Sequence, residues 1–449
     1  MRVYVYTTLI ILYIVSRFIS ESIVHYSVGI LGIIAIVVSA FYARGIYAIS
    51  GTIFFILGTI LFIFTKQPWY TFILHFEQVL GLLSLFFVLP FMNSLIHVGR
   101  YDQNLSILLQ NKITNLSKLY RRSFGVCYLL GLFLNIATIP LLVKSLNATL
   151  RDLPKNTVNK YYTQNLLRAY ALCLIWSPME VMVSTTIDIA NVKYYMILPI
   201  LLFIALMAVM FDWLLSSCKY KNIPISFDDQ RVGRLKNVYQ KVAQLVGVLV
   251  LFILIVSLVQ HVLNNGFLFS VVLLIVPFAI LWAILISKIR RYMVIAIRHW
   301  KERTNGLANY FFMFLSAGLF VEMLSQTKLL SALEPIFELT TERTLLLYLM
   351  IGAYFLVTSL IGFHPLVGLT LLAEILQPIL PKVPAIPLAV TLICCSLSTV
   401  MYSPYNISIS ILADELKTNP YRLGLWNIGF AICLNVFSIF VAFSIEKII

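Results

Sequence analysis

The sequence predicts an all-α polytopic membrane protein, with about 11 full transmembrane helices and two re-entrant hairpins arranged as an inverted repeat. The first observation is composition: of 449 residues, 61% are hydrophobic and 11% are charged, whereas a soluble domain has about 25% charged residues. The second is that apolar runs long enough to cross a bilayer recur along the whole chain. The third is a pair of similar proline-containing peptides that interrupt two of these runs in the two halves of the chain.

The first half is predicted to contain one hairpin and one interrupted helix among continuous spans. An amphipathic segment at 100–121 follows the fourth span, and its residues 102–117 are expected to lie in the membrane plane. The hairpin is expected at 123–150 and the interrupted helix at 163–190. The continuous spans of this half are expected near 3–20, 23–42, 45–65, 70–97 and 192–216.

The second half repeats this order after a polar loop at 217–237. The hairpin is expected at 345–376 and the interrupted helix at 386–414, and a basic stretch reaches to residue 303. The continuous spans are expected near 238–262, 267–289, 306–326 and 423–446.

The 33 Lys and Arg residues, which give a net charge of +15, indicate the orientation of these spans. Most of them fall in 98–122, 144–168, 217–241 and 288–303. Basic loops face the cytoplasm by the positive-inside rule, so we expect the N-terminus inside and the C-terminus outside. This assignment requires each hairpin to enter and leave on one face. Nucleic acid is not expected as a partner, because the hydropathy is that of a membrane protein.

The cysteines and the N-terminus carry no sign of a cofactor or of processing. None of the six cysteines forms a C-x-x-C pair, so we expect free thiols in helix packing and no metal site. No small-residue cleavage site follows the apolar residues 1–20, which favours a retained first helix over a signal peptide.

The two proline-containing peptides are the most informative feature of the chain. Ser177 to Asp188 and Ser403 to Asp414 align without a gap at an offset of 226 residues, and Ser, Pro, a second Ser and the final Asp coincide. Proline removes a backbone donor and breaks a helix. Broken membrane helices at matching positions of two halves indicate the binding site of a secondary transporter.

This order of elements resembles the ion transporter superfamily, which includes divalent-anion/sodium symporters and arsenite-efflux permeases. The segment Phe312 to Thr327 looks like the helix before the second hairpin of that family. The resemblance covers 70–216 and 306–446. The hairpin tips read Asn135-Ile136-Ala137-Thr138 and Gly362-Phe363-His364-Pro365, so the Ser-Asn-Thr signature of the symporters is partial at the first tip and absent at the second.

The resemblance implies an elevator-type mechanism, in which a domain of hairpins and broken helices slides against a dimeric scaffold. It also implies a division of the chain. Residues 1–69 would be N-terminal scaffold helices and 217–305 a linker with further scaffold helices. The first repeat would be 70–216 and the second repeat 306–449.

Polar residues at the tips and breaks are the candidate ligands of a solute or ion. Half-helix N-termini suit an anion, and unwound carbonyls suit a cation. The alternative for each serine is a hydrogen bond to its own helix or packing against a neighbour. The candidate residues at the first tip and first break are Asn135, Thr138, Ser177, Pro178, Glu180 and Ser184, and those at the second are His364, Pro365, Ser403, Pro404, Asn406 and Ser408.

Glu180 is the sharpest single candidate, because a carboxylate within an apolar span is costly unless it is neutral or paired. Its counterpart in the second peptide is Asn406, an amide of similar shape. One ionisable group opposite one amide suggests that only one half handles a proton or a sodium ion. A structural pair with Arg168 is the alternative, although three helical turns are too long for direct contact.

Other polar residues remain open between two interpretations. In the first interpretation, His364 titrates near neutral pH or donates a hydrogen bond to an anion. In the second, it is a hydrogen-bonded packing residue. Asn135 coordinates a cation, or it closes the hairpin turn. We expect Asp188 and Asp414 to be boundary residues, and Glu374 to lie towards the exit of the second hairpin.

These features predict a secondary active transporter that moves a small, anionic solute across the bacterial cytoplasmic membrane, coupled to H⁺ or Na⁺ and without another cofactor. Membrane lipids and a second copy of the chain are the expected partners. The alternatives are an exporter or flippase of a metalloid or lipid-linked envelope precursor, an envelope glycan enzyme, and a receptor or scaffold. Short outer loops argue against the enzyme, and broken helices argue against the scaffold.

Overall fold

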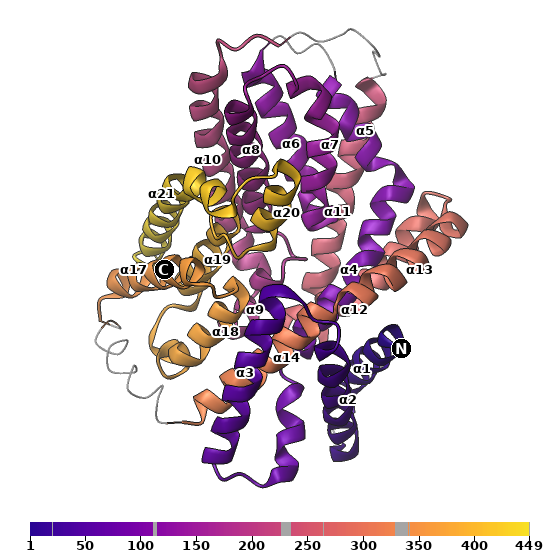
Figure 1. Cartoon of the computed structure of the whole chain (residues 1–449), viewed down its shortest axis with the longest axis vertical. Helices are drawn as coiled ribbons and strands as arrows, with labels where there is room; N and C mark the ends of the chain where they lie inside the picture. Colours follow the sequence, from indigo (N-terminus) through magenta and orange to yellow (C-terminus); the bar gives the residue numbers. More distant parts are fainter. Residues whose placement is uncertain are drawn as a thin grey trace. The chain divides into compact units, whose positions relative to one another are not determined.

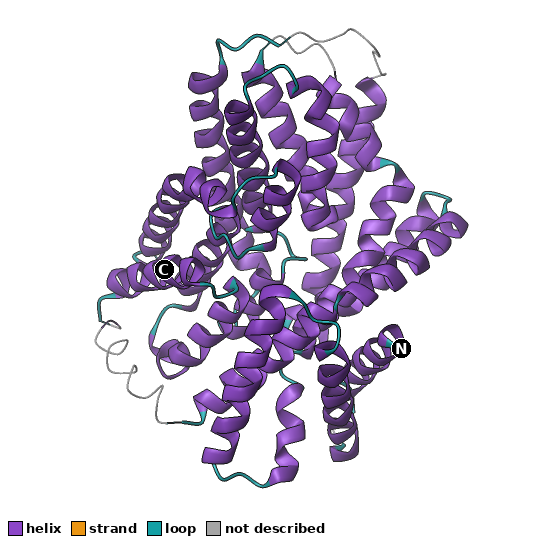
Figure 2. Cartoon of the chain, viewed as in Figure 1, coloured by secondary structure: helices purple, strands orange, loops and turns teal. Residues whose placement is uncertain are grey.

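The computed structural model describes residues 1–19, 21–110, 115–225, 235–263, 265–327, 340 and 342–448. Helices joined by short loops make up this part of the chain, and it contains no named strand (Figure 2). Residues 111–114 of the expected amphipathic segment and 226–234 of the expected polar loop lie outside the described residues. The expectation of an all-helical polytopic membrane protein is confirmed at this level.

Ten helices in the described ranges are long and apolar enough to cross a membrane, compared with the expected number of about 11. The residues around the first hairpin, Leu116–Leu150, count as one such span, and the N-terminal helix Arg2–Ser16 is too short to count. The first interrupted helix does not count either, since its first segment carries Lys155, Lys160 and Arg168.

The chain forms two compact units, and the first comprises residues 1–98, 258–342 and 370–380 (Figure 1). Its helices are α1 (Arg2–Ser16), α2 (Ser22–Ala40), α3 (Gly45–Phe64), η1 (Trp69–Phe76), α4 (Leu80–Gly99), α12 (Phe267–Leu285), α13 (Ile289–Gly306), α14 (Ala308–Ser325) and most of η4 (Gln377–Lys382).

The first unit is held together by close packing of α3 on α14. Gly58 makes this approach possible, because a Cβ there would lie 3.0 Å from the backbone nitrogen of Phe320. Tyr6 of α1 stacks on Phe311 of α14 with ring centroids 4.0 Å apart. Small residues at such contacts are typical of membrane helices, where packing rather than the hydrophobic effect drives association.

The second unit comprises residues 99–257, 343–369 and 381–449. Its elements are α5 (Tyr101–Ile107), η2 (Leu108–Gln110), α6 (Leu116–Leu134), η3 (Asn135–Ala137), α7 (Thr138–Leu150), α8 (Lys155–Leu174), α9 (Val181–Ile189), α10 (Tyr194–Tyr220), most of α11 (Leu235–Leu263), α17 (Thr344–Ile361), the start of α18 (Pro365–Leu376), α19 (Ala385–Ser398), η5 (Thr399–Met401), α20 (Ile407–Leu416) and α21 (Pro420–Glu446).

Two helices of this unit begin earlier than the hydropathy indicated. α6 begins at Leu116 rather than near 123, because the Asn115 side chain caps it by accepting a hydrogen bond from the Lys118 backbone at 2.9 Å. α8 begins at Lys155 rather than near 163, directly after Pro154, whose missing N–H costs a helix start nothing. Both first turns mix polar and charged residues with apolar ones, so an apolar pattern does not detect them.

Candidate functional site

Two helices of the second unit are interrupted at the proline-containing peptides. α8 ends at Leu174 and α9 begins at Val181. Likewise, η5 ends at Met401 and α20 begins at Ile407. The predicted interruptions at Pro178 and Pro404 are therefore present as breaks in regular helix.

The two breaks share backbone hydrogen bonds at an offset of 226 residues. The Glu180 N–H donates to the Ser177 carbonyl at 3.2 Å, and the Asn406 N–H donates to the Ser403 carbonyl at 3.0 Å. The first turn of the following helix also agrees: the Ser184 N–H donates to the Glu180 carbonyl at 3.0 Å. The matching bond, from the Ser410 N–H to the Asn406 carbonyl, measures 3.1 Å.

The correspondence continues to the ends of α9 and α20 and through the helices that follow. Asn191 and Lys417 both take a left-handed backbone with φ of 49°, which is a common way for a helix to end. α10 and α21 have 27 residues each, and their bounds differ by the same 226 positions. The local backbone thus follows the sequence repeat over two whole elements.

The interrupted helices and the first hairpin pack against one another within the second unit. α8 packs on both η5 and α20, and α9 packs on α19. The first segment of each interrupted helix therefore lies beside the second segment of the other. α7, which follows the tip at 135–137, also packs on α20.

At the first hairpin tip, Asn135 shapes the turn, and the Thr138 hydroxyl has no hydrogen-bond partner among the described residues. Asn135 has φ of +52°, its side chain accepts a hydrogen bond from the Ile136 backbone at 2.7 Å, and the Tyr170 hydroxyl donates to it. The Thr138 hydroxyl is also buried. A buried hydroxyl without a partner is costly, so Thr138 is the residue of this tip best placed to take a ligand.

At the first break, Glu180 is the residue immediately before α9 and is only 8% exposed. Its carboxylate lies close to the N–H groups of Val181 and Met182, although neither contact has the geometry of a capping bond. The positive end of the α9 dipole stabilises a negative charge there. The expected alternative, a pair with Arg168, is wrong, because Arg168 pairs with another carboxylate.

The serines at the breaks bond to carbonyl groups that the breaks leave without helical partners. Ser184 donates to the Pro178 carbonyl at 3.1 Å, and Ser408 donates to the Val400 carbonyl at 2.6 Å. Ser403 donates to the Ser359 carbonyl of α17 at 2.8 Å. These bonds hold the breaks in shape and occupy the carbonyl groups. Ser177 is also buried at the first break.

At the second break and second tip, side chains cap the helices that follow. Asn406 accepts a hydrogen bond from the Ser408 backbone at 3.1 Å, and its Oδ1 shares the single hydroxyl proton of Ser408, at 2.8 Å, with the Val400 carbonyl. The ring of His364 accepts from the Leu366 backbone at 3.3 Å, and Pro365 opens α18. Gly362 has φ of +125° and lies beside Tyr405, which places the second tip next to the second break.

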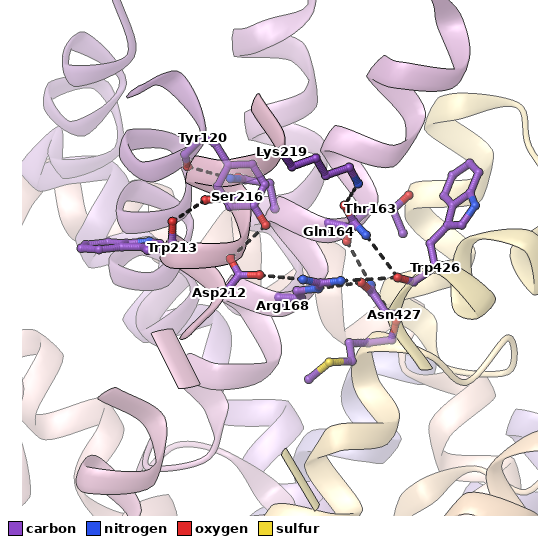
Figure 3. Close-up of polar contacts among 12 residues, drawn as sticks. Tyr120, Thr163, Gln164, Arg168, Asp212, Trp213, Ser216, Lys219, Trp426 and Asn427 are labelled. Carbon is purple, nitrogen blue, oxygen red and sulfur yellow. Dashed lines mark hydrogen bonds and ion pairs between the residues drawn. The ribbon is translucent and has the colours of Figure 1, made fainter. Parts of the chain in front are cut away.

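A buried ion pair that the sequence did not single out links four helices of this unit (Figure 3). Arg168 Nη1 of α8 lies 2.7 Å from Asp212 Oδ1 of α10, and the two side chains are 8% and 0% exposed. Asp212 also accepts from the Tyr120 hydroxyl of α6 at 2.9 Å. Arg168 Nε donates to Asn427 of α21 at 2.8 Å.

Asn427 extends this network to the second break. Its amide donates to the Thr163 carbonyl of α8 and to the Met401 carbonyl of η5, each at 3.1 Å. The charged members could have been found from the sequence as the single Arg and the single Asp of their apolar surroundings, since intramembrane charges are rare and pair with one another. We call Tyr120, Arg168, Asp212 and Asn427 the polar hub.

No group of three or more His, Cys, Asp or Glu residues that could hold a metal ion occurs among the described residues. All six cysteines are free thiols. The polar groups at the breaks are hydroxyl and amide groups, helix N-termini and one carboxylate.

Comparison with solved structures finds a protein that shares this fold. That protein is the YdaH transporter of Alcanivorax borkumensis, whose topology is described as unusual. The TM-score is 0.57 at 13% sequence identity, and the alignment covers 89% of this chain and 98% of that one. The similarity shows a shared fold. No family model and no curated protein matches the sequence.

Proposed function

We propose that the chain is a secondary active transporter of a small anionic solute, coupled to H⁺ or Na⁺. The observation that carries the proposal is the pair of helix breaks. The two breaks share backbone hydrogen bonds, and the first segment of each interrupted helix packs on the second segment of the other. Two broken helices related by an inverted repeat surround the solute site in several transporter folds. The fold neighbour is a transporter and not an enzyme, in agreement with this function.

The preference for an anion rests on the helix starts at the breaks. α9 and α20 begin directly after extended residues, with φ and ψ of −87° and 127° at Glu180 and −79° and 140° at Asn406. The positive dipole end favours a negative ligand at such a start, and protonation of Glu180 would remove the carboxylate charge that otherwise lies at the start of α9. The unpartnered Thr138 hydroxyl supplies a further donor.

We assign coupling to H⁺ or Na⁺ to the first break, because this break carries the Glu180 carboxylate. Glu180 and Asn406 occupy the same position before their helices, but only Glu180 can gain or lose a proton or pair with a cation. An asymmetric pair of this kind allows one half to hold the coupling ion while the other half supplies uncharged contacts. The preceding serines, Ser177 and Ser403, complete the site.

The mechanism that we propose is of the elevator type, within the ion transporter superfamily. All proposed site residues lie in the second unit and none lies in the first. This division supports a moving body formed by the second unit and a scaffold formed by the first, working as a homodimer. The proposed setting is the bacterial cytoplasmic membrane, with the N-terminus inside.

Reconstitution into liposomes tests the function. Uptake of labelled dicarboxylates, citrate and inorganic oxyanions is measured under an imposed pH or sodium gradient, with protein-free liposomes as the control. We expect one solute class to accumulate only while a gradient is present. The absence of gradient-dependent movement for every solute, in uptake and in efflux from loaded vesicles, would contradict the proposal.

A further inference from the structure

A polar cavity of about 450 Å³ lies at the C-terminal end of α10. The side chains of α6, α8 and α10 that line it include Tyr120, Gln164, Arg168, Asp212, Lys219 and Tyr220. Figure 3 shows Lys219 and Gln164 together and the Arg168–Asp212 pair beside them. The proposed transport site uses none of these residues.

The charge of this cavity is positive. Asp212 is neutralised by Arg168 at 2.7 Å and accepts from Tyr120 at 2.9 Å. The ammonium group of Lys219 donates to the neutral amide of Gln164 at 2.6 Å. Lys160 adds a further positive charge that acts on Lys219. An anion would therefore be attracted to the Lys219 end of the cavity.

An apolar groove of about 290 Å³ lies between α10 and α21. Its walls include Met207, Ala208, Phe211, Phe430, Leu434 and Phe437. Met207 and Phe211 are 41% and 46% exposed, so the groove opens to the outside of the unit. Among the described residues, those that line the groove are all uncharged.

The cavity and the groove lie on one face of α10 and meet at Arg168. Ala208 and Phe211 line the groove, while Asp212, Leu215 and Lys219 line the cavity, and this spacing places them along one helical stripe. Phe430 of the groove packs against the Arg168 guanidinium, whose carbon lies 4.5 Å from the ring centroid. From Ala208 to Lys219 the stripe is about 17 Å long, close to the ~15 Å of one hydrocarbon leaflet.

We propose that this combined surface binds an anionic phospholipid. The phosphate group occupies the Lys219 end of the cavity, and one acyl chain lies in the groove between α10 and α21. Three features favour a lipid over a soluble anion: the apolar groove adjoins the cavity at the Arg168–Phe430 contact, the groove opens outward, and the stripe of α10 that carries both is about as long as one leaflet. Basic pockets between helices near a membrane surface are typical sites for anionic headgroups.

Native mass spectrometry of the purified protein tests this proposal. The protein is titrated with dioleoylphosphatidylglycerol or with dioleoylphosphatidylcholine, and we expect one tightly bound molecule of the anionic lipid. Lys219→Gln is expected to weaken that binding about fivefold. Lys221→Gln is the matched control, because Lys221 is exposed two residues away and does not line the cavity.

A second variant tests the acyl half of the site. Cys433 is exposed and lines the groove, so Cys433→Trp is expected to fill the groove. This variant should weaken the binding of both lipids and leave the preference for the anionic lipid unchanged. Equal losses for Lys219→Gln and Lys221→Gln would overturn the proposal in favour of general surface charge. Displacement of the lipid by excess inorganic phosphate would overturn it in favour of a soluble anion.

Discussion

At the scale of single residues, the polar hub shows how buried charges are accommodated in an apolar bundle. The Arg168 guanidinium uses Nη1 for Asp212, Nε for Asn427 and Nη2 for the Trp426 carbonyl at 3.4 Å. A buried charge costs several kcal/mol unless such partners satisfy it. The hub therefore contributes specificity of packing among α6, α8, α10 and α21 more than net stability.

Removing one partner of the hub is expected to be far more harmful than removing a surface pair. Asp212→Asn leaves the Arg168 charge buried and should cost about 3–5 kcal/mol, measured as a lower melting temperature in detergent. Glu302→Gln is the control, because Glu302 pairs with Arg298 at 59% exposure, and no measurable change is expected. The double variant Arg168→Met and Asp212→Leu should recover part of the loss. Equal melting temperatures for Asp212→Asn and Glu302→Gln would contradict this account.

Glu180 is the residue on which coupling is expected to depend. Glu180→Gln keeps the shape of the side chain and its position before α9 but cannot ionise. Uptake into liposomes should lose its response to an imposed proton gradient while the protein still folds. Asp188→Asn, at the other end of α9 and exposed, is the matched control. An unchanged pH response in Glu180→Gln would remove this residue from the coupling role.

At the scale of elements, the second break is fixed by the helix that packs on it. Gly424 of α21 lies against the Tyr402 carbonyl, and a Cβ at this glycine would collide with that oxygen. Asn427, one turn further along the same helix, donates to the Met401 carbonyl at 3.1 Å. Helix α21 therefore sets the position of the chain between η5 and α20.

Two glycine substitutions on α21 separate this contact from helix propensity. Gly424→Ala should cost about 1–3 kcal/mol, because the backbone at Tyr402 must move, and transport should fall with it. Gly429→Ala meets no atom within 4 Å and should stabilise the helix by about 1 kcal/mol. Melting temperature and solute flux are the measurements. Equal effects of the two substitutions would show that α21 does not constrain the break.

At the scale of the whole molecule, the proposed elevator mechanism requires the transport site to belong to one of the two units. The interrupted helices, both tips and the polar hub belong to the second unit, while the first unit is held by the α3–α14 contact. A membrane protein can move such a unit at low cost only if its internal contacts are retained. The Arg168–Asp212 pair and the Asn427 bonds supply contacts of this kind within the second unit.

The orientation of the whole chain is predicted from its basic loops. An epitope tag at the C-terminus should be accessible from outside in right-side-out vesicles, whereas a tag at the N-terminus should become accessible only after permeabilisation. Both tags labelled on the same side would contradict the predicted threading, because one hairpin would then have to cross the membrane.

Assembly into a homodimer is the second prediction at this scale. Native mass spectrometry in mild detergent should give twice the chain mass of 51.1 kDa. The dimer should persist in Glu180→Gln, since that residue belongs to the second unit and not to the proposed scaffold. A purely monomeric protein in lipid nanodiscs would exclude the dimeric scaffold.

The sequence by itself determined the all-helical membrane class, because apolar runs long enough to cross a bilayer recur along it. It also determined the breaks at Pro178 and Pro404 and their common offset, because proline and helix-capping residues act on the backbone within a few positions of themselves. It missed the polar first turns of α6 and α8, since hydropathy detects only apolar turns. Only the tertiary structure decided that Arg168 pairs with Asp212, 44 residues away, and with Asn427, 259 residues away. Such contacts depend on how helices rotate and pack against one another, which local sequence does not specify.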